Sequence, residues 1–332
     1  METMQSRQNK AFAIVAAAQN PADLPHVEAR VRNACLFYPL HAPSQRDAVI
    51  QLLHDAPHLA EIFVFHGDGH LREAALHRLA SPCSGPASVY ALFSRLNDWA
   101  IPVRRAAAAA IARCLPITPA PVITPAIKAL VPVITTWRRW SHEGPQALDD
   151  LLMRRDVAAL ILSDILQSRE AGVGQMFRAL SINPWIDQHL DQIACSARQP
   201  NLRAMASHAI FSQTVVWPAR KMRRIWVDRS MGLYRQEPVF HDRALSVAAD
   251  RGAMINAAAR DRSGMVRRSA ADAMIALRHE AGLALAIETA AHLLTDDPNI
   301  GVQRRMQFLR QKLDQEKGAG HPAPLSLDQL SS

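Results

Sequence analysis

The sequence predicts an all-α protein, and three observations support this fold class. Hydrophobic residues make up 49% of the 332 residues, alanine is used heavily and aromatic residues amount to only 5%, which suits closely packed helices better than sheets. The stretch richest in β-branched residues, 121–136, contains prolines that a central strand does not tolerate. A phrase made of a polar turn followed by apolar residues at helical spacing also recurs along the chain.

The recurring phrase is clearest in DRSGMVRRSAADAMIAL, residues 261–277, where Asp261 precedes Val266, Arg267 and Ala270. Three other windows have the same order of polar turn, aliphatic residue, arginine and alanine: 66–80 with Arg72, 97–115 with Arg104, and 198–212 with Arg203. Weaker copies lie at 149–162, with Arg154 or Arg155, and at 296–309, where Gln303 replaces the arginine.

The phrase has a physical basis in helix packing. Asp, Asn, Gly and Ser before the apolar run cap a helix by accepting its free backbone N–H groups. The aliphatic residue and the alanine four positions later share one helix face, and the small alanine lets helix axes approach closely. The arginine lies near the turn, where it can bond a carboxylate or a backbone carbonyl of the adjacent unit. We therefore predict a structural role between repeats for Arg72, Arg104, Arg203 and Arg267.

This pattern resembles the second helix of HEAT repeats, including the bacterial HEAT-like repeats. The resemblance implies antiparallel helix pairs that stack into a right-handed α-solenoid with a concave face. The spacing of the copies is irregular, with 32 residues from Leu71 to Val103 but 64 from Leu202 to Val266. We expect the longer interval to hold an insertion. An irregular helical bundle is the alternative architecture.

The chain is expected to form one helical domain between two terminal segments. These are a partly ordered segment 1–24, a single solenoid 25–315 and a flexible tail 316–332 rich in Gly, Pro and Ser. The short apolar run near the N-terminus predicts a first helix rather than a signal peptide, and no run is long enough to span a membrane. The expected helices are 26–40, 44–66, 86–98 with 102–115, 124–140 with 147–167, 172–180 and 184–197 before 201–213, 241–260 with 263–279, and 281–294 with 299–314.

Positive charge is concentrated in the C-terminal half. Residues 203–268 contain thirteen basic and five acidic residues, an excess equal to the +8 of the whole chain. A basic stripe attracts phosphate backbones, and tryptophan rings can stack on bases. The alternative, which we favour, is that the tryptophans anchor the core and the arginines form solvated faces or bonds between repeats. Candidate binding residues are Trp137, Arg138, Arg139, Trp140, Arg220, Lys221, Arg223, Arg224, Trp226, Arg267 and Arg268.

The candidate metal ligands are better explained as turns. His66, Asp68 and His70 lack a nearby fourth ligand, and a capped turn accounts for the Asp and its glycine neighbours. Two His-Glu dipeptides, at 142–143 and 279–280, resemble those of the HEAT-like hydroxylases, which bind a di-iron centre with four such pairs. Only two pairs occur here, so we expect neither a metal nor another cofactor.

Cysteine usage and the lack of nucleophile motifs bear on location and activity. Cys35, Cys83, Cys114 and Cys195 lie far apart, which indicates reduced, mostly buried thiols in a cytoplasmic protein. The sequence has no GxSxG, no phosphate-binding loop and no HExxH. Their absence argues against catalysis without excluding it.

Three functions follow from these observations. The first is a non-catalytic scaffold that binds a macromolecule, a protein in the first place, through the concave face that the resemblance implies. The second is a nucleic-acid-binding protein, with the alkylpurine DNA glycosylases built on HEAT-like repeats as a possible enzyme class. For that class Trp217 and Asp228 join the tryptophans above as candidates by composition. The third is a subunit that assembles with itself. No membrane partner is expected.

Overall fold

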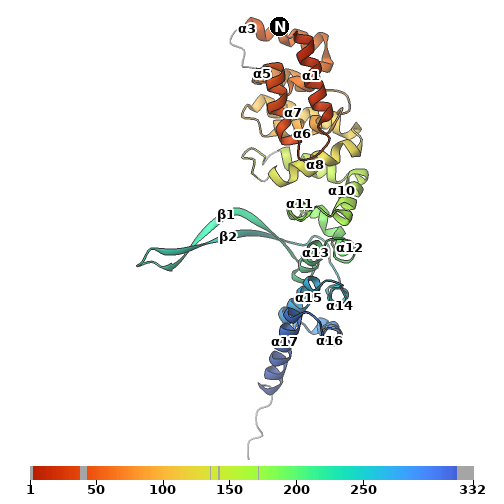
Figure 1. Ribbon diagram of the computed structural model, residues 1–332, viewed down its shortest axis with the longest axis vertical. Helices are drawn as coiled ribbons and strands as arrows, with labels where there is room; N and C mark the ends of the chain where they lie inside the picture. The colour runs from red at the N-terminus through yellow and green to blue at the C-terminus, as the bar shows by residue number, and fades with distance from the viewer. Residues whose placement is uncertain (1–2, 38–42, 135, 141–142, 171, 320–332) are drawn as a thin grey trace, which may run out of the picture. The chain divides into compact units, whose positions relative to one another are not determined.

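A computed structural model describes residues 3–37, 43–134, 136–140, 143–170 and 172–319 (Figure 1). These residues form seventeen α-helices and a single two-stranded antiparallel sheet. The chain divides into two compact units, each described by itself below. Unit 1 is Met1–Ile165 with Gln175–Trp185, and unit 2 is Leu166–Gly174 with Ile186–Ser332.

In the part of unit 1 that the structure describes, every regular element is a helix. Its elements are α1 Met4–Ala17, η1 Leu24–His26, α2 Val27–Cys35, α3 Pro43–Asp55, η2 Pro57–Leu59, α4 Ala60–Phe63, α5 Gly69–Arg78, α6 Pro86–Leu96, α7 Ile101–Cys114, η3 Leu115–Ile117, α8 Ala120–Ile134 and α9 Glu143–Leu152. Helices α10 Arg155–Gln167, α11 Val173–Leu180 and η4 Pro184–His189 are divided between the two units.

Unit 2 contains helices and the sheet. Its elements are α12 Leu190–Ser196, α13 Pro200–Ser212, β1 Thr214–Asp228, β2 Leu233–Ala244, α14 Arg251–Ala259, α15 Gly264–Leu277, η5 Ala281–Leu283, α16 Ala284–Leu293 and α17 Ile300–Ala319. Strands β1 and β2 form a long hairpin that leaves the helices beside α13 (Figure 1).

The windows of the recurring phrase form the helices that pack on one another within each unit. In unit 1, α5 packs on α7; in unit 2, α13 packs on α15 and α15 on α17. The aliphatic residue that precedes the arginine, or Gln303, is buried in five of the six windows: Leu71, Val103, Leu202, Val266 and Val302. The alanines four residues after the first four of these are completely buried, so the small side chain lies where the helices meet. The weak copy at 149–162 differs, because Met153 before Arg154 is 72% exposed.

The described chain is mostly helical, as predicted, and the hairpin is its departure from the all-α prediction. It lies in the long interval in which an insertion was expected, but its regular structure is β rather than α. The helix expected over 241–260 is also wrong in its first half, because β2 runs to Ala244 and α14 begins only at Arg251.

The ends of the chain partly match the expected segments. Helix α1 occupies most of the N-terminal segment, and its Ala11 and Val15 are buried. Most of the tail expected at 316–332 lies outside the described residues, but its first residues continue α17 to Ala319. In unit 1, Pro125 and Pro132 lie inside α8, so the proline-rich apolar stretch is a helix as predicted.

Candidate functional site

Three arginines of the recurring phrase, Arg72, Arg203 and Arg267, bond to the turn of the next packed window. Arg72 donates through Nε and Nη2 to the Asp98 carboxylate at 2.8 and 2.9 Å, and both side chains are almost fully buried. Arg203 bonds Asp261 in the same bidentate way, as Arg267 bonds Asp297. The remaining nitrogen, Nη1, donates to backbone carbonyls five or six residues earlier in the arginine's own turn.

The carboxylates of these pairs also organise their own turns. Asp261 accepts the backbone N–H of Ser263, and Asp297 accepts that of Asn299. Burial raises the pKa of the Asp261 carboxyl, but the bonds from Arg203 and Ser263 outweigh it, so its pKa lies below the usual range. The bond from Arg267 is the main cause of the lowered pKa of Asp297. The Asp261 and Asp297 carboxylates are therefore charged at neutral pH.

Two members of the phrase keep only part of this pattern. Arg104 donates through Nη1 to the carbonyls of Asp98 and Trp99. Gln303 donates through Nε2 to the carbonyl of Asp297 at 2.8 Å, which reproduces the carbonyl bond without the carboxylate bond. Its helix α17 is the last helix of the described chain, so no later described turn supplies a carboxylate.

The first aromatic-flanked basic stretch places its tryptophans in packing contacts. The rings of Trp137 and Trp140 meet edge to face with centroids 5.7 Å apart, and Trp140 also lies 6.1 Å from Phe93. Arg138 and Arg139 between them are exposed. The two arginines are therefore more accessible to a partner than the two tryptophans, which are half-buried.

The second basic stretch forms strand β1 of the hairpin, whose base is firmly anchored. Asp187 accepts two bonds from Arg243 at 2.7 and 2.8 Å, together with bonds from the backbone and hydroxyl of Ser246. Burial raises the pKa of Asp187, but these four bonds lower it overall. The N–H of Leu245 donates to the carbonyl of Gln213, which closes the base.

Beyond this base the hairpin is an arm, defined here as residues 216–242. Its tip is well formed, because Asp228 accepts bonds from the hydroxyl and backbone of Ser230 and from the backbone of Met231. Gly232 completes the turn at a φ of +68°, a conformation that favours glycine. The strands are out of register between Pro218 and Met222 and between Trp226 and Asp228.

The strand pairing gives the outer arm two different faces. Met222, Arg224 and Trp226 alternate on β1, and Trp226 pairs with Tyr234 on β2. Arg224 lies 4.2 Å from the centroid of the Tyr234 ring and 5.5 Å from that of Trp226. Together with Tyr234, these three β1 residues form what we call the aromatic face.

The opposite side, the charged face, holds Arg223, Ile225, Arg235 and Glu237. Arg235 and Glu237 form an ion pair at 2.6 Å, and Arg223 is exposed. Arg223 and Arg224 are neighbours on β1, so they project on opposite faces. Arg220 and Lys221 also lie on β1, but their side chains are outside those that the structure describes.

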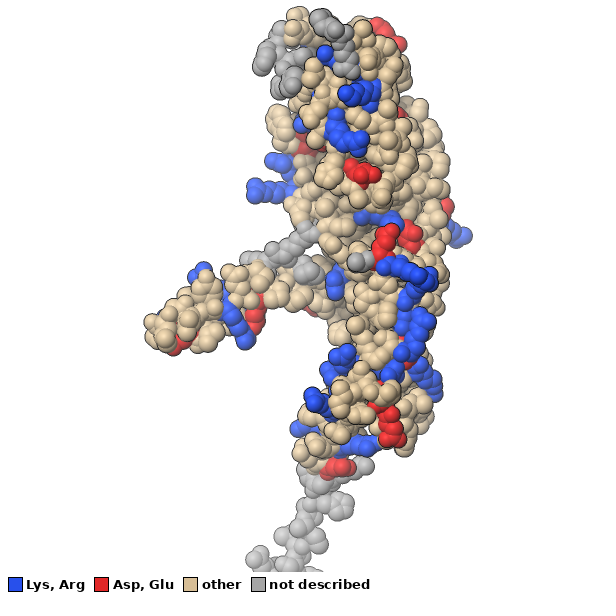
Figure 2. Space-filling view, in the orientation of Figure 1, with Lys and Arg blue, Asp and Glu red and all other residues tan. Residues whose placement is uncertain are grey.

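The arm exposes an unusual amount of apolar surface. Trp226 is 41% exposed and Met222 is 52% exposed, although both are paired with residues of β2. The other large hydrophobic residues exposed on the arm are Val216, Val227, Met231, Leu233, Tyr234 and Phe240. In Figure 2 the outer arm shows mostly uncharged surface with charged side chains scattered over it. Two strands alone cannot bury this surface, and an isolated hairpin is only marginally stable in water.

Most of these arm residues were not among the predicted site residues. Of the aromatic face, only Arg224 and Trp226 were named. The missed signal is a pair of strand-like runs, TVVWPARKMRRIWVD and LYRQEPVFHDRA, separated by a short turn that contains glycine. The predicted basic residues are not all available, because Arg267 is bonded to Asp297 and Arg268 is half-buried.

The remaining candidates behave as structural residues. His66 accepts the Asp68 backbone N–H on Nδ1, and burial lowers its pKa to about 4. Asp68 caps α5 by accepting the His70 backbone N–H. Glu280 is paired with Arg251, and His142 lies outside the described residues. The described residues contain no cluster of three or more side chains suited to a metal.

The helices and the comparisons with known proteins each give a negative result. Among the described helices, none combines the length and the apolar character needed to cross a bilayer. No protein-family model matches the chain, and comparison with curated proteins finds no significant match.

Proposed function

We propose that this chain is a non-catalytic, HEAT-like scaffold that binds an acidic protein through the aromatic face of its arm. The observation that carries the proposal is the exposed cluster of Met222, Arg224, Trp226 and Tyr234 on an anchored two-stranded ribbon. Tryptophan, tyrosine, methionine and arginine are the residues enriched where proteins bind one another. A HEAT-like arrangement of the helices is supported by the repeated bidentate links, such as Arg203 to Asp261.

Charge complementarity favours an acidic partner. The arm together with its base, residues 214–244, carries seven basic and three acidic residues. A second copy of the chain would bring two positive arms together within a protein of net charge +8, which opposes self-association. A protein with an apolar strip bordered by carboxylates matches both the apolar and the basic character of the arm.

Nucleic acid is the second candidate, because a two-stranded ribbon fits the major groove of DNA and the arm is basic. The exposed apolar residues argue for protein instead, since a phosphate backbone offers no apolar surface to cover Met222, Met231 or Leu233. We also keep the cytoplasmic setting that the sequence predicts, with which the four free cysteines agree.

The experiment is photo-crosslinking from the arm, followed by binding measurements with the purified partner. A benzophenone amino acid replaces Tyr234, and the same group at exposed Leu285 on α16 serves as the control position. We expect one acidic protein to crosslink from position 234 and not from 285. Its dissociation constant should rise at least tenfold in Trp226→Ala and remain within twofold in Trp99→Ala, which removes a tryptophan that is 71% exposed in unit 1.

Three results would overturn the proposal. The first is crosslinking to nucleic acid instead of protein. If the affinity for duplex DNA also falls steeply with salt and is lost in Arg223→Glu, the arm binds nucleic acid, the second candidate. Crosslinks between two copies of the chain would assign it to self-assembly. Equal effects of Trp226→Ala and Trp99→Ala would remove the arm from binding altogether.

A further inference from the structure

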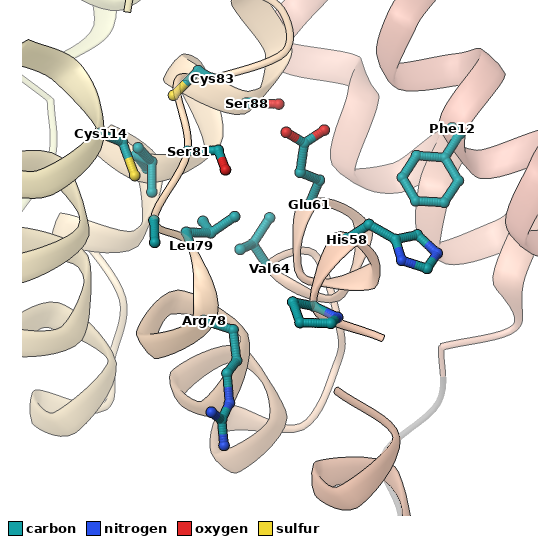
Figure 3. Close-up of a pocket in the computed structure, with 13 residues that line it drawn as sticks. Phe12, His58, Glu61, Val64, Arg78, Leu79, Ser81, Cys83, Ser88 and Cys114 are labelled. Carbon is teal, nitrogen blue, oxygen red and sulfur yellow. The ribbon is translucent and has the colours of Figure 1, made fainter. Parts of the chain in front are cut away.

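Unit 1 contains a cavity of about 360 Å³ that the proposed function does not use (Figure 3). Its floor is apolar and buried, formed by Val64, Leu92, Cys83 and Cys114. This volume is at the lower end of the range of small-molecule sites, which are mostly apolar with a few polar groups that orient the ligand. The cavity therefore has the size and the lining of a site for a small molecule.

The walls of the cavity are held in place by bonds between elements. The backbone N–H of Cys83 donates to the hydroxyl of Thr118, which in turn donates to the carbonyl of Cys114. Arg113 donates to the carbonyls of Leu76 and Leu79 at the end of α5. These bonds join the loop after α5 to α7 and η3, so the cavity does not depend on a flexible segment.

One carboxylate dominates the polar side of the cavity. Glu61 on α4 directs its carboxylate toward the serine side, near Ser81 and Ser88 (Figure 3). It accepts a bond from the Ser84 hydroxyl, and Ser84 lies 3.2 Å from the Ser88 hydroxyl. Arg78 also lines the cavity, but its side chain extends away from Glu61. Among the described residues Glu61 has no cationic partner.

The charge of Glu61 acts on the thiols of the floor. Burial is the main cause that raises the pKa of Cys83 to about 12, and the negative charge of Glu61 contributes to the rise. Burial likewise raises the pKa of Cys114, with a smaller contribution from Glu61. The thiols are therefore neutral at physiological pH, and Glu61 is the acidic side chain among the residues that line the cavity.

An aromatic pair completes the cavity on its other side. The rings of Phe12 on α1 and His58 on η2 are stacked with centroids 6.0 Å apart. A cation is attracted to the face of an aromatic ring as well as to a carboxylate. An apolar floor, one unpaired carboxylate, serine hydroxyls and an aromatic wall together select a cation with an apolar body.

We infer that this cavity binds a small organic ammonium ion, with its charged head held by Glu61 and the serine hydroxyls and its apolar body on the floor. An anion of the same shape is disfavoured because it would bring a second negative charge beside the Glu61 carboxylate, and a neutral molecule lacks the attraction of an ion pair. The site lies wholly within unit 1 and does not depend on the arm of unit 2, so either proposal can fail without the other.

The test is calorimetric titration of the full chain with 2-phenylethylammonium and, separately, with phenylacetate. We expect the ammonium to bind and the anion not to bind. Glu61→Gln should weaken ammonium binding at least tenfold, because it keeps the shape and the acceptor for Ser84 but removes the charge. Glu73→Gln on α5, the same change outside the cavity, should leave binding within twofold.

Failure of any of these results overturns the inference. No binding at millimolar concentration, equal binding of phenylacetate, or equal affinity in Glu61→Gln and wild type would each do so. A lysine side chain of another protein carries the same ammonium chemistry, so Nα-acetyllysine methylamide is titrated as well. Tighter binding of that probe than of 2-phenylethylammonium would overturn the assignment to a small molecule.

Discussion

Arg203 and Asp261 are 58 residues apart in the sequence, yet Arg203 donates two hydrogen bonds to the Asp261 carboxylate at 2.7 and 2.8 Å. The whole arm lies between them. Helix α13 packs on α15 as α5 packs on α7, although no insertion separates the latter pair. The arm is therefore an insertion between two windows of the recurring phrase, and their packing continues across its base.

Removing the guanidinium of Arg203 should destabilise unit 2. Arg203→Ala leaves the partly buried Asp261 carboxylate and the carbonyl of Ala197 without their partner. The loss of one member of a buried ion pair costs about 3–5 kcal/mol. The measurement is the free energy of unfolding from urea titration, with Arg262→Ala at an exposed neighbouring position as the control.

An exposed surface substitution is expected to change the free energy of unfolding by less than about 0.5 kcal/mol. A change this small in Arg203→Ala would show that the pair does not join the two windows. The double variant Arg203→Met with Asp261→Leu should recover part of the loss, because it leaves no buried charge unpaired.

A second prediction follows from the different bonds of Arg267, which binds a carboxylate, and Gln303, which binds only a backbone carbonyl. Arg267→Gln should lose the bonds to Asp297 and destabilise unit 2 by several kcal/mol, since the Asp297 side chain is only 3% exposed. The reverse change, Gln303→Arg, should alter the free energy of unfolding by less than about 0.5 kcal/mol. The reason is that no later turn among the described residues supplies a carboxylate for the new arginine. Urea titration of both variants checks the asymmetry, and equal effects would contradict it.

The buried His66 should make the stability of unit 1 depend on pH. Its pKa in the folded protein is about 4, below the 6.5 of an ordinary histidine. As the pH falls from 6.5 to 4, the unfolded chain takes up a proton that the folded chain does not, so stability is lost over this window. The loss attributable to His66 is at most on the order of 3 kcal/mol.

This pH dependence is measured as the difference in unfolding free energy between pH 7 and pH 4.5. His66→Asn, whose side-chain oxygen can still accept the Asp68 N–H, should show a smaller difference than the wild type. The exposed His54→Asn serves as the control and should match the wild type. If this difference is the same in His66→Asn as in the wild type, His66 is not the source of the pH dependence.

The helices could be predicted because their cause is local. Val266, Arg267 and Ala270 each report one physical requirement: a buried aliphatic side chain, a donor near the turn and a small residue at the contact. The partner of each arginine was harder to find, because Asp261 is remote in sequence from Arg203. The position of the arginine in the recurring phrase indicates that it needs a carboxylate partner, but it does not identify the residue that provides the carboxylate.

Neither the arm nor the cavity could be predicted from the recurring phrase. Strand β1 carries two register irregularities, so the alternation of Met222, Arg224 and Trp226 does not extend along its whole length. Arg223 and Arg224 were predicted as binding residues from the basic charge of their segment. In the structure, the feature that sets this surface apart is the exposed hydrophobic residues around them. The cavity around Glu61 is built from six helical elements and a loop, and no short sequence window contains it.

Hydrogen exchange of the arm amides tests the central claim most directly, namely that the aromatic face is a docking surface without a partner in the isolated chain. In the free protein, amides from Met222 to Pro238 should exchange much faster than those of α13 and α15, because an isolated two-stranded ribbon is marginally stable. Adding the acidic protein that crosslinks to position 234 should slow exchange in this segment. An arm that is fully protected in the free chain, or one whose exchange is unchanged by the bound partner, would contradict the account.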